Sequence, residues 1–277
     1  MAVWGVLCLI VIGLLAPGLY NGLKIRRYTI ETEALGHRVR IALVTDLHSC
    51  RYGENEQVLI DAIHAENPDI LLLGGDIFDD QLPDTNVVWF LAGIADRYPC
   101  YYVTGNHEYW SGEQAFAEKM AILERFKIVR LIDESVTVSI QGETLHLYGV
   151  DDPDAEMISS AVSGRRKTPS EQAADWEAFG AKDGYTVLLA HRPGPLRFYA
   201  ACGIDLALCG HTHGGQWRIP GLLNGLFAPD QGLFPRYAGG RYEENGTIMI
   251  VSRGLALEST GIPRFYNRPE LVIIDLV

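Results

Sequence analysis

The sequence predicts an α/β protein in which two mixed β-sheets pack together with helices outside, all in one domain. The first half of the chain alternates apolar runs rich in β-branched residues with amphipathic segments, and the later part is richer in strand-like runs. Small sets of polar residues recur directly after the predicted strands. With 277 residues, 48% of them hydrophobic, the chain can bury a core without disulfides or a structural metal.

Apolar runs mark the predicted strands. Residues 39–45 are rich in β-branched side chains, and residues 69–73 form a continuous apolar run, which is typical of a strand covered on both faces. Further strands are predicted at residues 100–104, 136–140, 145–150, 186–190, 205–208, 247–252 and 271–276, with a hairpin turn at residues 141–142.

Helical spacing of apolar residues predicts a helix over residues 54–66, which Pro68 ends. The same spacing predicts helices over residues 86–95 and 113–125. A fourth helix is predicted over residues 170–179, with Glu171 in its first turn. The polar stretch 151–170 is predicted to be a loop.

The net charge of −12 argues against a nucleic-acid-binding protein, which would show a basic surface. The short run Arg165-Arg166-Lys167 is interpreted as a solvated loop. An acidic chain repels anions at long range, so a phosphate substrate requires local positive charge, which bound metal ions supply. The five cysteines form no CxxC pair, which fits free thiols in a reducing compartment.

The N-terminus predicts a membrane anchor, since residues 2–23 contain no charged side chain. We therefore divide the chain into an anchor at residues 1–23, a linker or edge strand at residues 24–37, and a folded domain at residues 38–277. Lys24, Arg26 and Arg27 directly follow the apolar run and predict a domain on the cytoplasmic side of the inner membrane.

Two other interpretations of this segment stay open. A cleaved secretory signal would carry basic residues before the apolar run, and a twin-arginine signal would place its arginines there, whereas Arg26 and Arg27 come after it. The apolar run could also form a buried or interfacial helix.

The residues suited to chemistry fall in five short segments, each directly after a predicted strand. The segments are Asp46-Leu47-His48, Gly74-Gly75-Asp76, Gly105-Asn106-His107-Glu108, His191 and Gly210-His211-Thr212-His213. Because open α/β sheets bind ligands at the carboxyl ends of their strands, these side chains are expected to meet at one rim.

Carboxylate, amide oxygen and imidazole in this combination indicate a site for divalent ions such as Mn, Fe, Zn or Co. The candidate ligands are Asp46, His48, Asp76, Asn106, His191, His211 and His213. They are too many for one tetrahedral ion and suit two ions that share a carboxylate. Glycines directly precede Asp76, Asn106 and His211 and allow tight turns that bring backbone close to the site.

Simple loop polarity is a weak alternative, because five of the eight histidines lie in these segments. The other three, His37, His64 and His146, are interpreted as ordinary surface or helix residues.

The five blocks, with Asp79 in the second, resemble the calcineurin-like metallophosphoesterase superfamily from about Arg38 to the C-terminus. The resemblance implies a four-layer α/β/β/α sandwich and two divalent metal ions, with a metal-bridging hydroxide that attacks phosphorus. It implies that Asp46, His48 and His213 hold one metal, that Asn106, His191 and His211 hold the other, and that Asp76 bridges them. It further implies that His107 is a catalytic acid or transition-state stabiliser, and that Asp79 and Glu108 orient imidazoles.

Residues 105–110, 210–217, 252–254 and 268–270 are similar to a group of small bacterial membrane-linked phosphodiesterases. That group includes enzymes that cleave the pyrophosphate of UDP-diacylglucosamine in lipid A synthesis. Arg192 and Arg253 are tentative partners for a second phosphate, although structural salt bridges are an equal alternative. The apolar stretch 217–234 is either a lipid-contacting lip or a loop packed on the sheet.

Three functions follow from these features. The first is a phosphoesterase acting at the membrane on a lipid-linked nucleotide-sugar diphosphate. The second is a general phosphodiesterase or phosphatase with a soluble substrate. The third, a non-enzymatic scaffold, is disfavoured because all seven candidate ligands are present.

Overall fold

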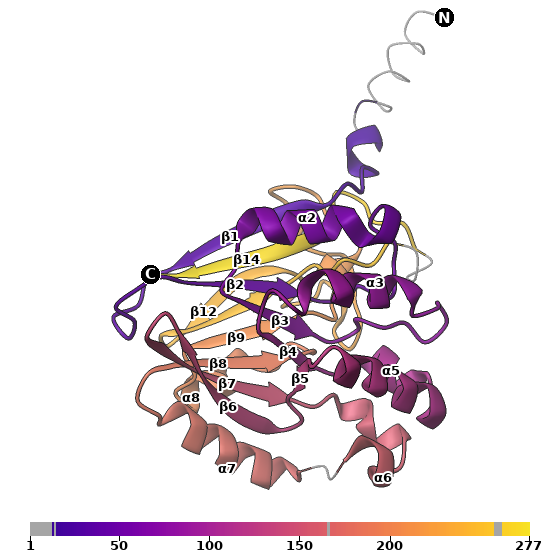
Figure 1. Cartoon of the computed structure of the whole chain (residues 1–277). Coiled ribbons are helices and arrows are strands. Elements are labelled where there is room, and N and C mark those ends of the chain that lie inside the picture. The colour runs from indigo at the N-terminus through magenta and orange to yellow at the C-terminus, as the bar shows by residue number, and fades with distance from the viewer. Residues whose placement is uncertain (1–12, 14, 165–166, 258–261) are drawn as a thin grey trace, which may run out of the picture.

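The computed structural model describes residues 13, 15–164, 167–257 and 262–277 (Figure 1). Two six-stranded sheets lie face to face with helices on the outer faces, which confirms the predicted fold class. Residues 165–166 of the basic run and residues 1–12 and 14 of the predicted anchor lie outside the described residues. Within the described part, no helix is long and apolar enough to cross a membrane.

The first sheet carries the strands of the N-terminal half together with the last strand of the chain. Its order is β1 (Lys24–Ile30), β14 (Glu270–Leu276), β2 (Val39–Val44), β3 (Ile70–Gly74), β4 (Cys100–Val103) and β5 (Val129–Arg130). Strands β2 to β5 are parallel, whereas β14 runs antiparallel to β2 and parallel to β1. Residues 24–30 therefore form an edge strand.

The second sheet is built from the later part of the chain. Its order is β12 (Gly240–Glu244), β13 (Thr247–Val251), β9 (Leu206–Cys209), β8 (Tyr185–Ala190), β7 (Glu143–Val150) and β6 (Glu134–Ile140). The four central strands are parallel and the two edge strands are antiparallel to their neighbours. A small ribbon pairs β10 (Phe227–Ala228) with β11 (Gly232–Leu233).

The central strands are apolar almost throughout because successive side chains point to opposite faces of the sheet and both faces are covered. Ile41 and Leu43 of β2 pack in the central core with Val187 and Leu189 of β8. Their neighbour Ala42 belongs to a second cluster, beneath the helices of the first sheet. Both faces of the strand are covered, so both sets of side chains gain free energy from burial.

Helices cover both outer faces. The first sheet carries α2 (Gln57–Glu66), α3 (Thr85–Ile94) and α5 (Glu113–Arg125), and the second carries α7 (Pro169–Gly180) and α8 (Leu196–Ala201) (Figure 1). Shorter helices are η1 (Glu54–Glu56), α4 (Asn106–Trp110), η2 (Pro153–Met157), α6 (Ser160–Ser163) and η3 (His213–Gly215).

Three local predictions differ from the structure. The helix expected over residues 54–66 is broken into η1 and α2, because Asn55 and Glu56 at the end of η1 adopt left-handed backbone conformations. The expected loop 151–170 contains η2 and α6, and the Asp152 carboxylate caps η2 by accepting the Asp154 N–H at 2.9 Å. His146 is neither a surface nor a helix residue: it is buried in β7, between the Thr137 hydroxyl and a backbone carbonyl.

Candidate metal centre

The five motif segments meet at one rim of the two sheets. Strands β2, β3 and β4 of the first sheet and β8 and β9 of the second each end directly before a segment. Because these five strands are parallel within their sheets, their carboxyl ends lie on the same side of each sheet. The seven candidate ligands are all buried, each at most 7% exposed.

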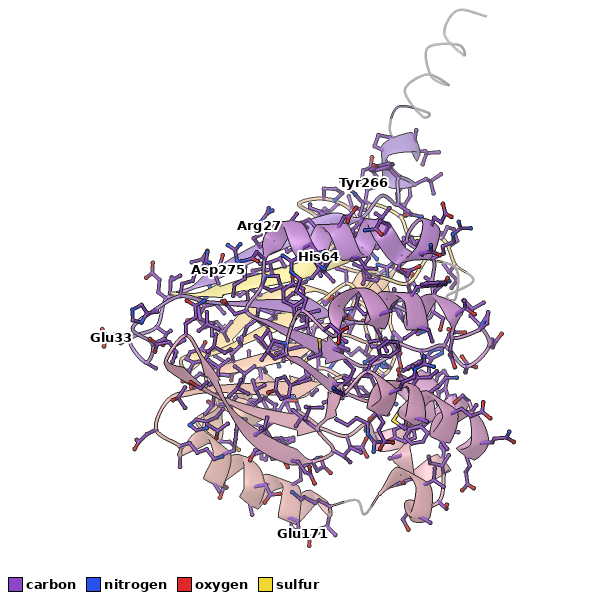
Figure 2. The ribbon with its side chains drawn as sticks, in the orientation of Figure 1. Arg27, Glu33, His64, Glu171, Tyr266 and Asp275 are labelled. Atoms are coloured by element: carbon purple, nitrogen blue, oxygen red, sulfur yellow. The ribbon has the colours of Figure 1, made fainter. Side chains whose placement is uncertain are left out.

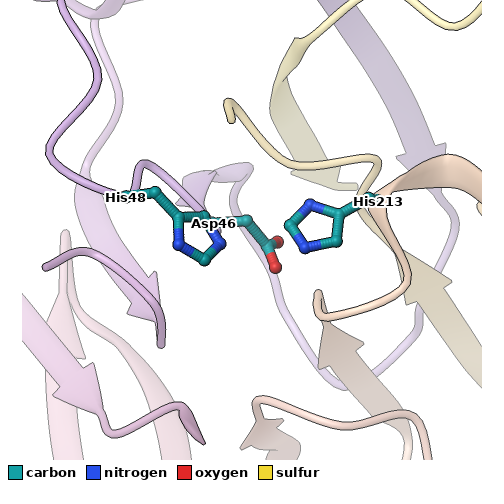
Figure 3. Close-up of side chains that lie close together, drawn as sticks. All are labelled: Asp46, His48 and His213. Atoms are coloured by element: carbon teal, nitrogen blue, oxygen red, sulfur yellow. The ribbon is translucent and has the colours of Figure 1, made fainter. Parts of the chain in front are cut away.

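One group of ligands joins the two sheets. Asp46 and His48 follow β2, and His213 follows β9, yet one ligand atom from each lies within 4.8 Å of the others. Figure 3 shows the Asp46 carboxylate between the two imidazole rings. This group matches the residues expected to hold one metal.

The second group surrounds His191, whose Nε2 lies 3.1 Å from Asp76 Oδ2 and 3.2 Å from Asn106 Oδ1. His211 Nδ1 is 3.2 Å from the same nitrogen. Asp76 Oδ2 is also 3.5 Å from His48 Nε2 of the first group. Asp76 thus lies between the two groups, where a bridging ligand has to lie.

Several buried ligand atoms have no hydrogen-bond partner among the described residues. They are Asp46 Oδ2, His48 Nε2 and His213 Nδ1. A buried polar atom without a partner costs roughly 1–3 kcal/mol. Because these atoms all belong to candidate ligands, the arrangement fits bound divalent cations that supply the missing partners.

The backbone at the ligands is strained. Asp46 (φ 50°), His48 (φ 49°), Asp76 (φ 50°), His211 (φ 67°) and His213 (φ 45°) all adopt the left-handed region. Residues other than glycine rarely adopt this region, and such strain is typical of functional sites. Strands β2, β3 and β9 are therefore each followed by a sharp turn at the candidate ligands.

Two glycines bring backbone close to the ligand carboxylates, as the sequence predicted. A Cβ atom on Gly105 would lie 2.2 Å from Asp76 Oδ1, and one on Gly210 would lie 2.5 Å from Asp46 Oδ2. No other residue fits at these positions without moving a ligand.

Carboxylates and imidazoles shift one another's protonation in the metal-free site. Burial disfavours charge on Asp76, but His191 and His48 outweigh it and hold the carboxyl pKa well below its usual range. Burial likewise opposes charge on His191, yet Asp76 and Asp46 raise its pKa to about 10. The proton on His191 thus supplies positive charge at a position where a metal ion would supply it.

The other second-group histidine behaves differently. Burial and the neighbouring His191 lower the pKa of His211 to about 4. Burial and His48 also lower the pKa of His213 well below its usual range. Both imidazoles are therefore neutral at physiological pH, which is the form that binds a metal.

Partners outside the ligand set orient two of the imidazoles. Asp79 Oδ2 lies 3.1 Å from His48 Nδ1, so Asp79 has the position expected of it. The Gly74 carbonyl lies 3.0 Å from His191 Nδ1. In both cases the second ring nitrogen is left to face the ligand group.

The expectation that Glu108 orients an imidazole is wrong. Its carboxylate accepts backbone N–H bonds from Asp76 (3.0 Å), Ile77 (2.8 Å), Phe78 (3.1 Å) and Gly105 (2.8 Å). Burial raises the pKa of Glu108 to about 7. The side chain therefore fastens the loop after β3 to the loop after β4, which fixes Asp76 relative to Asn106.

His107 is set apart from the seven ligands by its exposure. Its side chain is 19% exposed, and its Nδ1 lies 2.6 Å from Asp80 Oδ1. Its ring packs edge-on against His48 at 4.3 Å between centroids. The imidazole is thus held at the mouth of the site by a carboxylate, which suits a group that meets substrate.

Two residues at the site were not predicted from the sequence. Asp80 holds His107, and its position next to Asp79 was the signal that could have identified it. Asp230 lies 2.9 Å from His211 Nε2, although it belongs to the β10–β11 turn, outside every motif. Only the tertiary structure brings it to the site.

The two arginines proposed as tentative substrate contacts are placed differently. Arg192 makes ion pairs with Asp152 (2.8 Å), Asp154 (2.9 Å) and Asp230 (2.7 Å), which favours the structural alternative. Arg253 pairs with Glu270 at 3.4 Å and lines a separate cavity.

Comparison with known proteins gives the same assignment. The family model for calcineurin-like phosphoesterases matches residues 39–215. An uncharacterized metallophosphoesterase of Aquifex aeolicus is 29% identical over 265 residues, covering 92% of each chain. Phosphodiesterase YaeI of Escherichia coli is 28% identical over 243 residues, covering 86% of this chain and 82% of its own.

Among solved structures, the NAD nucleotidase of Haemophilus influenzae aligns with a TM-score of 0.55 and 15% identity, over 80% of this chain and 46% of its own. At that identity the likeness concerns the fold alone. The ligand geometry and the family match together show that the chain belongs to the calcineurin-like phosphoesterase family, and that it is a metal-dependent phosphoesterase that uses two divalent metal ions.

Proposed function

We propose that this phosphoesterase hydrolyses a lipid-linked nucleotide-sugar diphosphate at a membrane surface, in the manner of a UDP-diacylglucosamine pyrophosphatase. The observation that carries the proposal is the apolar lip, which we define as residues 217–234. Its side chains Leu222, Leu233 and Phe234 are 81%, 67% and 68% exposed. Apolar side chains exposed together mark a surface that contacts lipid or another apolar partner.

The lip is joined directly to the metal site. Asp230 lies within the lip and contacts His211 at 2.9 Å and Arg192 at 2.7 Å. Trp217, at the start of the lip, follows the ligand His213 by four residues and is 46% exposed. An acyl chain resting on the lip would therefore belong to a substrate whose phosphate is close to the metals.

The residues of the site divide the chemistry between them. The bound metal pair supplies Lewis acidity and lowers the pKa of a water molecule, so that hydrolysis proceeds near neutral pH. The Asn106 ligand is neutral, so the site keeps net positive charge for a phosphate. His107 bonds Asp80 through Nδ1, which leaves Nε2 to deliver a proton to the departing oxygen or to stabilise charge on the phosphoryl group.

We propose further that the domain is held at the cytoplasmic face of the inner membrane by residues 1–23. The uncharged run up to Leu23 and the cations Lys24, Arg26 and Arg27 that follow it support this location. Digestion of inverted membrane vesicles with external protease tests it. The domain should sediment with the vesicles and be degraded without detergent; protection from the protease would contradict the proposal.

Product analysis tests the substrate. With added Mn, Fe, Zn or Co, the full chain should release UMP from UDP-diacylglucosamine, and Asp76→Ala should not, because Asp76 contacts both ligand groups. The double variant Leu233→Ser/Phe234→Ser should raise KM for this lipid while leaving turnover of an activated soluble diester unchanged. Val58→Ser/Trp89→Ser, which alters exposed apolar residues of α2 and α3, is the matched control.

Absence of UMP under metal-replete conditions would rule out the lipid-linked substrate. Continued turnover of the soluble diester would then favour a general phosphodiesterase. The likeness to the Escherichia coli relative named phosphodiesterase YaeI supports that second candidate.

A further inference from the structure

A second cavity lies beside the metal site and is lined by cations. It measures about 470 Å³, within the range of about 300–1,000 Å³ that is typical of small-molecule sites. We call it the basic pocket and define it by Lys24, Arg26, Arg218 and Arg253. Lys24 and Arg26 come from β1, Arg253 follows β13, and Arg218 belongs to the apolar lip.

The charge of the basic pocket is poorly balanced. The four cations gather there although the whole chain has a net charge of −12. Glu270 is the carboxylate that faces them, 3.7 Å from Arg26 and 3.4 Å from Arg253. One fully buried carboxylate offsets one cation, so about three positive charges have no counterion among the described residues.

The cations of the basic pocket lie close enough together to lower one another's pKa. The Lys24 ammonium makes no hydrogen bond or ion pair within the described part of the chain, and burial together with Arg26 and Arg253 lowers its pKa. Burial and Arg253 lower the pKa of Arg218 to about 10. Arg218 is 8% exposed and donates to the Gly214 carbonyl at 2.9 Å and to the Asn224 side chain, so it is held rigidly at the wall.

Apolar side chains border the basic pocket. Ile219 and Leu222 line it and are 47% and 81% exposed. A separate apolar hollow of about 250 Å³ adjoins the same lip and is lined by Leu15, Leu19, Trp217, Pro263 and Phe265. This surface therefore combines cations that line a pocket with exposed apolar side chains. The same combination is typical of protein surfaces that bind anionic lipid.

The basic pocket also lies next to the N-terminal segment. Tyr266, which lines the pocket, donates its backbone N–H to the Gly18 carbonyl at 2.6 Å. Figure 2 shows Tyr266 where that segment joins the body of the molecule. The basic pocket is therefore close to the described part of the segment that we propose holds the domain at the membrane.

We propose that the basic pocket binds the phosphate of an anionic phospholipid headgroup, with Ile219 and Leu222 entering the acyl region. Arginine and lysine bind phosphate through several charge-assisted hydrogen bonds, and the three uncompensated cations supply the charge. The basic pocket shares the apolar lip with the proposed function, but none of its four cations is a candidate metal ligand, so its binding of phospholipid can be measured separately from hydrolysis.

Binding to the metal-loaded full chain in non-ionic micelles tests this site. Calorimetric titration with short-chain phosphatidylglycerol should show saturable binding, and Lys24→Gln/Arg26→Gln should weaken it roughly 30-fold, at about 1 kcal/mol per cation. Arg97→Gln/Arg130→Gln removes two exposed cations elsewhere and is the matched control. Turnover of a soluble activated diester should be equal in all three proteins, which shows that the metal site is intact.

Two parallel titrations identify the source of the phosphate. Short-chain phosphatidylcholine should bind more weakly than phosphatidylglycerol, and inorganic phosphate should not distinguish wild type from Lys24→Gln/Arg26→Gln. Equal sensitivity of inorganic phosphate and phosphatidylglycerol to the double variant would overturn the lipid assignment. Phosphatidylglycerol binding that is unchanged in the double variant would overturn the site itself, whatever the outcome for diester turnover.

Discussion

At the scale of single residues, His107 depends on a carboxylate that the motifs do not contain. Asp80 Oδ1 lies 2.6 Å from His107 Nδ1, and Asp79 Oδ2 lies 3.8 Å away. This pair fixes the ring and its tautomer at the mouth of the site, as carboxylates do for other catalytic histidines. Asp80 is therefore a positioning residue.

Substitutions of His107 and Asp80 should distinguish a residue that takes part in the reaction from one that only positions it. His107→Ala should lower kcat for an activated diester by about 10²- to 10⁴-fold, because a general acid contributes that much. Asp80→Asn should lower kcat by about 10- to 100-fold and shift the pH profile, with KM nearly unchanged. Metal content, measured in parallel, should stay at the wild-type value in both variants. An unchanged kcat in His107→Ala would show that this imidazole has no part in the reaction.

Gly254 lies directly against the candidate metal ligand Asp46 and belongs to none of the five motif segments. Its φ is +69°, and a Cβ there would lie 2.6 Å from Asp46 Cβ. Gly254→Ala should therefore displace Asp46 and lower both metal content and activity at least 10-fold. Gly142→Ala is the matched control, because Gly142 has φ +91° with open space around it. The control should lose only about 1–2 kcal/mol of stability from strain, measured by urea unfolding, with normal metal content.

At the scale of elements, the pairing of β2 with β14 joins the two ends of the folded domain. Arg40 and Asp275 face each other across these antiparallel strands. The guanidinium donates to both carboxylate oxygens, at 2.7 and 2.9 Å. Figure 2 shows Asp275 near the end of the sheet. The hydrogen bonds from Arg40 lower the pKa of Asp275.

This pair predicts a specific dependence of stability on pH. Because the folded-state pKa of Asp275 is depressed, its stabilisation is present above pH ~4 and is lost as the pH falls through the folded pKa. Asp275→Asn should reduce the free energy of unfolding at pH 7 by up to about 1 kcal/mol, and the deficit should vanish on acidification. Asp96→Asn, at an exposed carboxylate without an ion pair among the described residues, is the matched control for these urea titrations.

At the scale of the whole molecule, the candidate metal ligands come from both sheets. Asp46, His48, Asp76 and Asn106 follow strands of the first sheet, and His191, His211 and His213 follow strands of the second. The buried ligand atoms without partners lie between the sheets, so removing the metals leaves unsatisfied polar groups at this junction.

Metal removal should therefore lower the melting temperature as well as abolish activity. A metal present at about 1,000 times its Kd adds about 4 kcal/mol, which corresponds to roughly 10 °C for a chain of this size. Scanning calorimetry with and without a chelator measures the shift. Asp76→Ala should show a much smaller shift, because it lacks the shared ligand. Equal melting temperatures of the loaded and chelated wild type would contradict a role of the metals in joining the sheets.

The sequence by itself determined most of the sheet strands, the longer helices and the seven candidate ligands, because each of these depends on local order. It did not indicate β5, β12 or α8. The nearly continuous apolar runs of β2 and β8 indicate burial on both faces of each strand. A motif such as Gly210-His211-Thr212-His213 contains its candidate ligands within four consecutive residues. Periodicity and motif spacing are properties of the chain itself, so they can be recognised before folding.

Only the tertiary structure decided the contacts between segments far apart in the chain. In the structure, Glu108 accepts hydrogen bonds from the backbone of the Asp76 loop, where the sequence had predicted contact with an imidazole. Arg192 forms ion pairs with three carboxylates. The tertiary structure also brought Asp230 to His211, and gathered the cations of the basic pocket from β1, the lip and the end of β13. These contacts follow from how the two sheets pack, which no local pattern encodes.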